Sequence, residues 1–138
     1  MSRLPSAEEP DVLAANSAFY DAFTRGDLAA MDQLWARRAP VACIHPGWDA
    51  LRGRDRVMQS WRAILGGGGG PEVRCAAPVA HVHGETAVVI CREILATGRL
   101  IATNVFVREG ERWMLVHHQA APIASGEEEE DEAGGLLN

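Results

Sequence analysis

His45 is the side chain of this sequence best placed for acid–base chemistry. Alternation puts Val41, Cys43 and His45 on one face of a short predicted strand, and Pro46, which has no N–H for a sheet, ends that strand directly after the histidine. An imidazole with a reference pKa of ~6.5 gives or takes a proton near neutral pH. Two interpretations stay open: a site residue oriented by Asp49, or a hydrogen-bonded core histidine.

Polar residues also interrupt two later apolar strands. Asn104 lies amid alternating apolar residues and must find hydrogen-bond partners if it is buried. Glu93 presents the same problem on the preceding strand, where an ion pair with Arg92 or Arg99 at the sheet rim is the alternative. In the last strand, His117 and His118 fall on opposite faces, so the strand register decides which of them points inward.

Three tryptophans, Trp35, Trp48 and Trp61, are candidates for the wall of an apolar ligand pocket. Their indole N–H groups would supply the few polar contacts that such a pocket needs. Each taken singly is more typical of a core, but three indoles in a small domain favour a ligand. Metal chemistry has little support, because His81 and His83 lie at a hairpin end and the three cysteines are scattered. We therefore expect no metal and no cofactor.

The net charge of -6 comes from the end of the chain. Residues 127–132 hold six of the 19 acidic residues, and the remaining 13 balance the 13 basic ones. A neutral body lacks the clustered cations of a nucleic-acid-binding protein, and no apolar run is long enough to span a membrane. We expect a cytoplasmic protein with one domain over residues 1–124 and an acidic disordered tail over residues 125–138.

Two helices are predicted before the His45 strand. The first covers about residues 11–24, with Ser6 and Glu9 as a capping pair and Pro10 in the first turn. Gly26 suits the left-handed stop after it, and Asp27 is placed to cap the second helix, which carries Leu28, Met31, Leu34 and Trp35.

A third helix and four strands follow the His45 strand. The helix opens near Gly53 with an apolar stripe, and the glycines at 66–70 end it, because no Lys-Ser/Thr follows them to make a phosphate loop. Strands are predicted at about 72–82, 86–96, 99–108 and 112–121. The short glycine-containing turns between them favour antiparallel hairpins.

Several short motifs, in this order, resemble the SnoaL-like branch of the nuclear transport factor 2-like superfamily. They run from Phe19-Tyr20 and Arg25-Gly26-Asp27-Leu28 through Trp35, His45-Pro46-Gly47-Trp48, Leu51-x-Gly53-Arg54 and Trp61 to Trp113-x-x-Val116-His117-His118. The last motif is also similar to the calcium/calmodulin-dependent kinase II association domain. The resemblance covers about residues 12–122. It implies an α+β fold, a cone in which a curved antiparallel sheet wraps around three N-terminal helices.

The superfamily that this chain resembles also contains ketosteroid isomerase, and the resemblance implies which residues of this chain occupy the positions of that enzyme's catalytic residues. His45 corresponds to the aspartate base of that enzyme, Asn104 to its aspartate donor, and Phe19 to its tyrosine donor, with Tyr20 beside it. These departures count against steroid isomerisation, because an amide does not replace a neutral carboxylic acid and a phenol. The register of the resemblance points His118 inward, and burial in an interface is the alternative for His117.

These observations predict a pocket lined by Phe19, Tyr20, Trp35, His45, Trp48, Trp61, Asn104 and His118. The expected function is binding of a small apolar or carbonyl-bearing molecule, or cofactor-independent isomerase, cyclase or dehydratase chemistry, with His45 as acid–base and Asn104 or His118 polarising a substrate oxygen. The alternative is a noncatalytic assembly module with a vestigial cavity. Because both sheet faces are apolar, we also expect a homodimer formed through the outer face.

Overall fold

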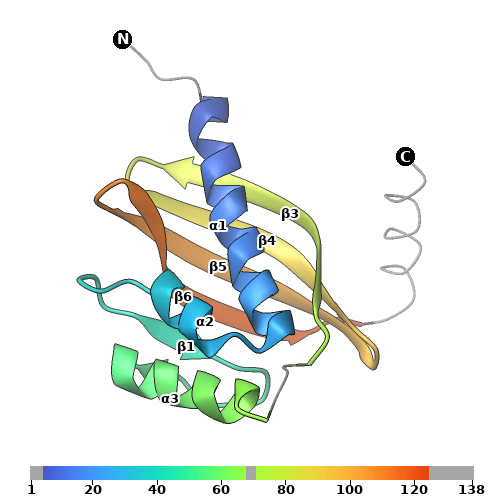
Figure 1. Cartoon of the computed structure of the whole chain (residues 1–138). Helices are drawn as coiled ribbons and strands as arrows, with labels where there is room; N and C mark the ends of the chain where they lie inside the picture. The colour runs from blue at the N-terminus through green and yellow to red at the C-terminus, as the bar shows by residue number, and fades with distance from the viewer. Residues whose placement is uncertain (1–4, 68–70, 125–138) are drawn as a thin grey trace.

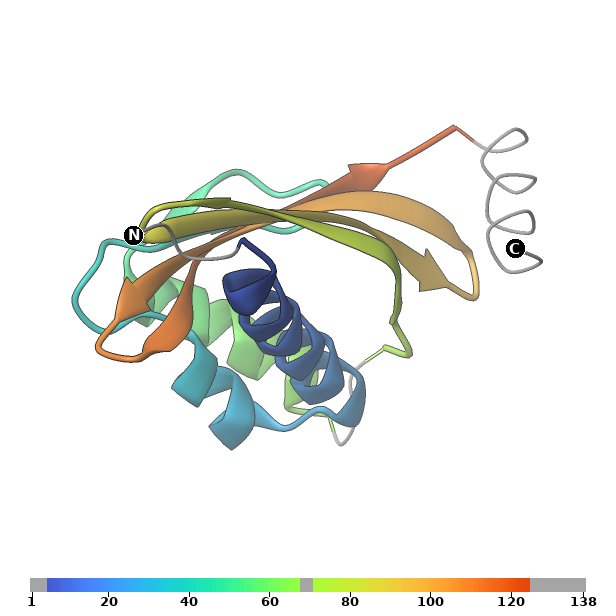
Figure 2. The ribbon, with the colours of Figure 1, turned by 90° about the horizontal axis from the view of Figure 1, so that it is seen from above.

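A curved six-stranded sheet arches over three helices that pack against its inner face (Figures 1 and 2). The structure is a computed structural model and describes residues 5–67 and 71–124. The element order is helix, helix, two short strands, helix and four long strands, as the sequence predicts except for one of the short strands. The acidic tail predicted beyond residue 124 lies outside the described residues.

The first helix, α1 (Pro5–Arg25), begins earlier than predicted. Ser6 therefore lies inside the helix and is not its cap, and Pro10 lies beyond the first turn, where its missing N–H removes one backbone hydrogen bond. The end of α1 agrees with the sequence. Gly26 adopts the left-handed φ of 66° that a residue with a Cβ rarely adopts.

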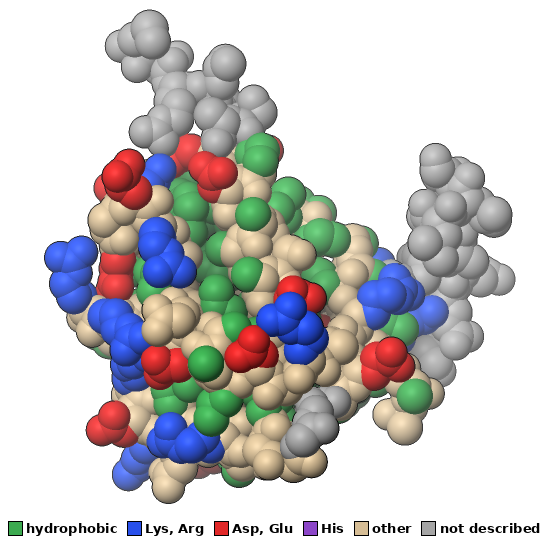
Figure 3. Space-filling model, in the orientation of Figure 1, with side chains coloured by type: hydrophobic (Ala, Val, Ile, Leu, Met, Phe, Trp, Pro, Cys, Tyr) green, Lys and Arg blue, Asp and Glu red, His purple; other side chains and the backbone are tan. Residues whose placement is uncertain are grey.

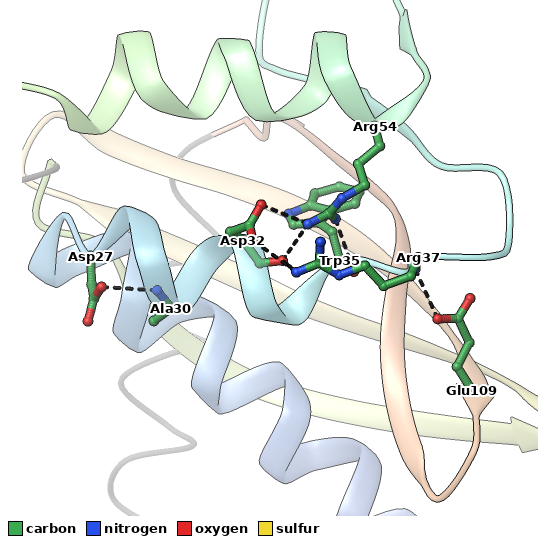
Figure 4. Close-up of polar contacts among 7 residues, drawn as sticks. All are labelled: Asp27, Ala30, Asp32, Trp35, Arg37, Arg54 and Glu109. Carbon is green, nitrogen blue, oxygen red and sulfur yellow. Dashed lines mark hydrogen bonds and ion pairs between the residues drawn. The ribbon is translucent and has the colours of Figure 1, made fainter.

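The second helix, α2 (Leu28–Leu34), is capped as predicted. The Asp27 carboxylate accepts the backbone N–H of Ala30 at 3.0 Å (Figure 4). Trp35 was predicted to belong to this helix. It is instead the extended residue that follows the helix, and it makes an isolated parallel bridge to Leu115. This bridge ties the exit of α2 to the sheet.

The third helix, α3 (Arg54–Leu65), starts at Gly53 and ends at Gly66, as the sequence predicts. Its predicted apolar stripe is buried against the sheet and α1, with Val57, Met58, Trp61 and Leu65 facing inward. The sequence places this helix correctly because its apolar spacing and its glycine boundaries agree.

The strands are β1 (Ala42–Ile44), β2 (Leu51–Arg52), β3 (Arg74–His83), β4 (Thr86–Leu95), β5 (Gly98–Glu109) and β6 (Arg112–Pro122). They lie in the order β2-β1-β6-β5-β4-β3, and β1 alone pairs in parallel, with β6. The three predicted hairpins β3–β4, β4–β5 and β5–β6 are confirmed. Strand β2 was not predicted, because its two residues are too few to show the alternation of apolar and polar side chains that identifies a strand.

Two bulges alter the sheet where the sequence predicts strict alternation. In β6 the register shifts between the partners of Val105 and Phe106, so Val116 is an extra residue. Trp113, Leu115 and His118 are therefore all buried, although alternation had separated His118 from the other two. The second bulge lies in the edge strand β3, where Ala77 has a φ of 53° directly before Pro78.

The two faces of the sheet differ in their burial. Inward residues of β4 and β5, including Val89, Ala102 and Phe106, are buried beneath the helices. On the outer face, Val79, Ile90 and Ile101 from three adjacent strands remain 53%, 42% and 37% exposed. The α+β cone predicted for this chain is therefore confirmed, and one apolar patch remains outside it.

Candidate functional site

A chain of buried polar side chains crosses the interior between α1 and the sheet. Tyr20 Oη donates to Glu93 Oε2 at 2.7 Å. The Asn104 amide nitrogen donates to Asn16 Oδ1 at 2.8 Å and to Tyr20 Oη at 3.1 Å. His118 Nδ1 lies 2.6 Å from Asn104 Oδ1. We call these five residues the inner polar network, and all five are buried.

The fold brings the network together from three directions. Asn16 and Tyr20 are four residues apart and therefore share the inward face of α1. Glu93 lies on the inward face of β4, and Asn104 of β5 pairs directly with His118 of β6. The polar atoms satisfy one another, which stabilises groups that burial alone would make costly.

The hydrogen bonds define the proton positions in the network. Because the Asn104 nitrogen already donates twice, its oxygen is the acceptor, and His118 carries its hydrogen on Nδ1. Its Nε2 lone pair then faces Glu93 Oε2 at 3.8 Å. Burial, followed by the nearby His45 and His117, lowers the pKa of His118 to about 3. His118 is therefore a neutral imidazole at neutral pH.

Glu93 is the titratable group of the network whose pKa moves toward neutrality. Burial raises the pKa of its carboxyl, and the hydrogen bond from Tyr20 partly opposes that rise. The predicted rim ion pair of Glu93 with Arg92 or Arg99 is wrong, because the carboxyl is buried and accepts from Tyr20. Burial, followed by the nearby Glu93 carboxylate, raises the pKa of Tyr20, so its phenol keeps its hydrogen.

Two thiols lie against the network. Cys91 Sγ donates to Tyr20 Oη at 3.4 Å, and the Asn16 amide donates to Cys75 Sγ at 3.6 Å. All three cysteines, including the buried Cys43, are free thiols. Burial raises the pKa of Cys43 to about 12, and the hydrogen bond with Cys91, followed by burial, raises that of Cys75. Cys43 and Cys75 therefore fill space as protonated thiols and are poor nucleophiles.

His45 lies outside the inner polar network. Its Nε2 is 2.8 Å from Ser60 Oγ, and Ser60 donates its own hydrogen to Val57 O at 2.7 Å. The imidazole is therefore the donor in the bond to Ser60. Burial lowers the pKa of His45 to about 4, and edge contacts with Trp48 and Trp61 enclose the ring.

Asp49 is an exposed loop residue hydrogen-bonded to its own neighbour, and the structure shows no hydrogen bond between it and His45 within the described residues. Its carboxylate accepts the N–H of the adjacent Ala50 at 2.7 Å, as a loop aspartate commonly does. The partner that sequence reasoning missed is Ser60. The only sequence signal for it is its position on α3 next to the apolar stripe residue Trp61.

A hollow of about 470 Å³ between α1 and β3 reaches one end of the inner polar network. It is lined by Leu13, Asn16, Ser17, Tyr20, Asp21, Thr24, Glu72, Val73, Arg74, Cys75 and Pro78. Asn16 and Tyr20 belong both to the wall of this hollow and to the network. A bound molecule would therefore meet the network through these two side chains.

The other predicted pocket residues do not line this hollow. Phe19, Trp35 and Trp61 are fully buried in the core. Phe19 packs on Tyr20 and on His118, with ring centroids 4.8 Å and 4.9 Å apart, and so supports the network from behind. Trp48 is 46% exposed and covers His45. The aromatic residues thus fix the positions of polar groups more than they enclose a space.

The residue that sequence reasoning missed in the network is Asn16. The signal for it was present, because Asn16 falls on the same helical face as Val12, Phe19 and Tyr20, where a polar residue must find a partner. Within residues 5–67 and 71–124, no group of three or more His, Cys, Asp or Glu side chains is arranged to hold a metal ion. None of the described helices is long and apolar enough to cross a membrane.

The arched sheet over three helices, with a polar site in its interior, defines an α+β cone of the NTF2-like class. The SnoaL-like domain family matches residues 12–125, and the chain belongs to this family. A solved structure from Streptomyces avermitilis, a candidate dehydratase of the NTF2-like family, is 33% identical with a TM-score of 0.80, covering 88% of this chain and 100% of that one.

Two further relatives differ in the functions that their names suggest. A candidate calcium/calmodulin-dependent protein kinase type II association domain from Thiobacillus denitrificans is 33% identical, with a TM-score of 0.72, and the match covers 81% of this chain and 94% of that one. The F-box protein SKIP8 of Arabidopsis thaliana is 27% identical over 112 residues, which are 80% of this chain and 48% of that protein. The chain thus spans about half the length of that curated relative.

Proposed function

We propose that this protein binds a small, largely apolar molecule with a carbonyl or hydroxyl oxygen in the hollow between α1 and β3, and acts on it by acid–base chemistry. The observation that carries the proposal is that Tyr20 lines the hollow and at the same time bonds to a buried carboxyl of raised pKa. Leu13, Val73 and Pro78 supply an apolar wall. The dehydratase description of the 33% identical S. avermitilis protein agrees with this class of reaction.

Glu93 and Tyr20 form a two-step proton path in this proposal. When Glu93 is ionised, it accepts the Tyr20 hydrogen. When Glu93 is protonated, it donates to Tyr20 Oη in place of the weaker Cys91 thiol donor, and the phenol hydrogen becomes free to bond a ligand oxygen in the hollow. Asn104 holds the phenol in position, and His118 holds Asn104 through its amide oxygen. A carbonyl would be polarised in this way. A leaving hydroxyl would take the Tyr20 proton, which Glu93 replaces, while solvent takes the proton lost from the neighbouring carbon.

The proposal moves the acid–base role from His45 to Glu93 and Tyr20. His45 bonds to Ser60 and, among the described residues, makes no hydrogen bond to the inner polar network; the Trp61 ring packs against both imidazoles, with centroids 4.8 Å from His45 and 6.1 Å from His118. Its pKa of about 4 also makes it a weak base at neutral pH. We assign His45 a structural role, joining the end of β1 to α3.

The test is a thermal-shift screen with cyclic ketones and enones, followed by NMR of a ligand labelled with ¹³C at its carbonyl. Binding should raise the melting temperature by mass action, and a hydrogen bond from Tyr20 should move the carbonyl resonance downfield. Tyr20→Phe should abolish the resonance shift, whereas Ser17→Ala, at the wall of the hollow but outside the network, should retain it. No stabilisation by any compound, or equal shifts in Tyr20→Phe and wild type, would contradict the proposal.

A second candidate function is assembly through the outer sheet face. The exposed patch of Val79, Ile90 and Ile101 favours it, because monomeric proteins rarely leave neighbouring large apolar side chains on adjacent strands in water. The association-domain description of the T. denitrificans protein agrees with it. The two functions are compatible, because the hollow and the patch lie on different faces of the sheet.

A further inference from the structure

A second hollow, of about 370 Å³, lies at the other edge of the sheet, where β1 and β2 meet the segment 36–41. It is lined by Ala36, Arg37, Ala39, Pro40, Val41, Ala42, Arg52, Gly53, Arg54 and Val116. Three of these residues are arginine, and none of them is acidic. We call it the arginine hollow.

Arginine is concentrated in the lining of the arginine hollow, and the carboxylates of Asp32 and Glu109 contact the same segment from outside that lining. All 13 basic residues of the chain are arginine, and residues 36–54 contain four of them against a single aspartate, Asp49. Figure 3 shows arginine side chains on the left side of the molecule, interspersed with acidic ones. Guanidinium groups bind carboxylates and phosphates through paired N–H donors, which Lys cannot do.

Two of the arginines are held in place by one carboxylate. Arg54 donates to Asp32 Oδ1 at 2.7 Å and to the backbone oxygens of Asp32 and Trp35 at 2.8 and 3.1 Å. Arg37 donates to Asp32 Oδ2 at 2.9 Å (Figure 4). Two positive charges therefore share one negative charge, and a net positive charge remains.

The third arginine, Arg52, is exposed and makes no hydrogen bond or ion pair with the described part of the chain. It lies opposite Ala42 in the β1–β2 ladder, and Ala42 forms part of the same hollow. Its guanidinium is therefore available to a bound anion, whereas Arg37 and Arg54 give the site its fixed positive wall.

The wall formed by residues 36–41 is already fixed by a carboxylate of the chain itself. Glu109 accepts the backbone N–H groups of Arg37, Arg38 and Ala39 at 2.8–2.9 Å. Figure 4 shows Glu109 approaching this segment from the β5–β6 hairpin. Glu109 is not among the residues that line the arginine hollow, so it holds the wall from behind and offsets part of the charge of Arg37 and Arg38.

We propose that the arginine hollow binds a small organic anion: a carboxylate or phosphate group joined to a short apolar body. The arginines would hold the anionic group, and Ala36, Ala39, Pro40, Ala42 and Val116 would contact the apolar part. The amino end of α3 contributes a minor favourable potential, because Gly53 provides no side-chain cap there. This site is separate from the hollow between α1 and β3, so either proposal survives failure of the other.

The experiment is a titration of the full-length ¹⁵N-labelled chain with benzoate, followed by amide NMR at low salt. The amides of Ala42, Arg52 and Val116 should shift with a dissociation constant of about 1 mM or tighter. Arg52→Gln should weaken benzoate binding at least about fivefold, because it removes the free guanidinium. Arg62→Gln, an exposed arginine of α3 outside the hollow, is the matched control and should bind as wild type does.

Three further titrations test whether the hollow recognises the negative charge of the ligand and whether the acidic tail of the chain already occupies it. Benzamide, which has the same shape without the charge, should bind at least about tenfold more weakly than benzoate, and equal binding overturns the proposal. Inorganic phosphate should compete with benzoate at the same amides. A full-length variant in which residues 127–132 carry Gln and Asn for Glu and Asp should bind benzoate as wild type does. A tenfold gain in that variant would assign the hollow to the acidic tail and overturn the proposal.

Discussion

His45 and His118 are buried imidazoles that differ in what surrounds them. His118 bonds to an amide and faces a carboxyl, whereas His45 bonds to a serine between two tryptophans. Burial is nevertheless the main cause of the lowered pKa of both residues, to about 3 and about 4. At the residue scale, burial rather than the reference pKa of imidazole therefore sets the charge of this site.

The lowered pKa of His45 predicts a stability that depends on pH. Between about pH 6.5, the unfolded value, and about pH 4, the folded value, the unfolded chain binds more protons, so the free energy of unfolding falls as the pH falls. His45→Gln keeps a donor for Ser60 but removes the titration. We expect its free energy of unfolding to fall less steeply in this range, by up to about 1.4 kcal/mol per pH unit.

Urea unfolding at intervals from pH 4 to pH 8 measures this slope. Ser60→Ala is the control, because it removes the partner of His45 and leaves the imidazole, so it should lower stability at every pH without flattening the slope. Identical slopes for His45→Gln and wild type would mean that burial does not shift this imidazole.

At the scale of elements, the segment between α2 and β1 is held by contacts from distant parts of the chain. Trp35 bridges to Leu115, Ala36 donates its N–H to Leu115 O at 2.9 Å, and Glu109 accepts three N–H groups of the next residues. A segment without regular structure is thereby fixed to the β5–β6 hairpin. The same contacts form the wall of the arginine hollow.

Glu109→Gln should loosen this segment. Partial burial alone would raise the pKa of Glu109, but the three backbone N–H groups and the nearby Arg38 hold it below the usual value. The stabilisation is therefore present above the unfolded pKa of about 4.3 and is lost as the pH falls through the folded value. We expect the variant to lose at most about 1 kcal/mol at pH 7, because solvent screens this exposed carboxylate, and progressively less as the pH falls below about 4.

Glu111→Gln provides the matched control for that experiment, because Glu111 lies exposed in the same hairpin. Hydrogen exchange of the amides of Arg37, Arg38 and Ala39 gives a local readout, and it should accelerate in Glu109→Gln alone. Equal exchange in the two variants would show that the three hydrogen bonds do not hold the segment.

At the scale of the whole molecule, the described residues cover the sheet on its inner face and leave apolar side chains exposed on its outer face. Val79, Ile90 and Ile101 remain exposed, and Val105 and Val107 lie partly exposed on the same face. A second copy of this chain would cover that patch with the same apolar residues, as a two-fold interface requires. We therefore keep the homodimer as a prediction for the protein in solution.

Val105→Asp tests the dimer, because it places a charge on the outer face of the sheet within the proposed interface, where burying it without a partner is costly. Sedimentation equilibrium at micromolar concentration should give a dimer for wild type and a monomer for this variant. Ala18→Asp, which adds the same charge to an exposed position of α1, should remain dimeric. A wild-type chain that sediments as a monomer contradicts the prediction.

Much of the fold follows from local patterns in the sequence. Glycine-containing turns separate the long strands, Asp27 caps α2, and the stripe of α3 identifies its buried face, because each of these features depends on residues close together in the chain. The bulge at Val116 is different, because one extra residue breaks the alternation that grouped His118 with Met114 and Val116; the inward facing of His118, which the family resemblance predicted, is confirmed. Local patterns thus determine which elements form.

Which residues come together in the site was decided by the tertiary structure. Asn104 and Asn16 are 88 positions apart, and Tyr20 and Glu93 are 73 apart, so their contact depends on how α1 crosses the sheet. The sequence alone indicated that Asn104, Glu93 and His118 were polar residues in need of partners. Only packing decided that they satisfy one another through Tyr20, because a buried hydrogen bond forms between the groups that the fold brings together, whatever their distance along the chain.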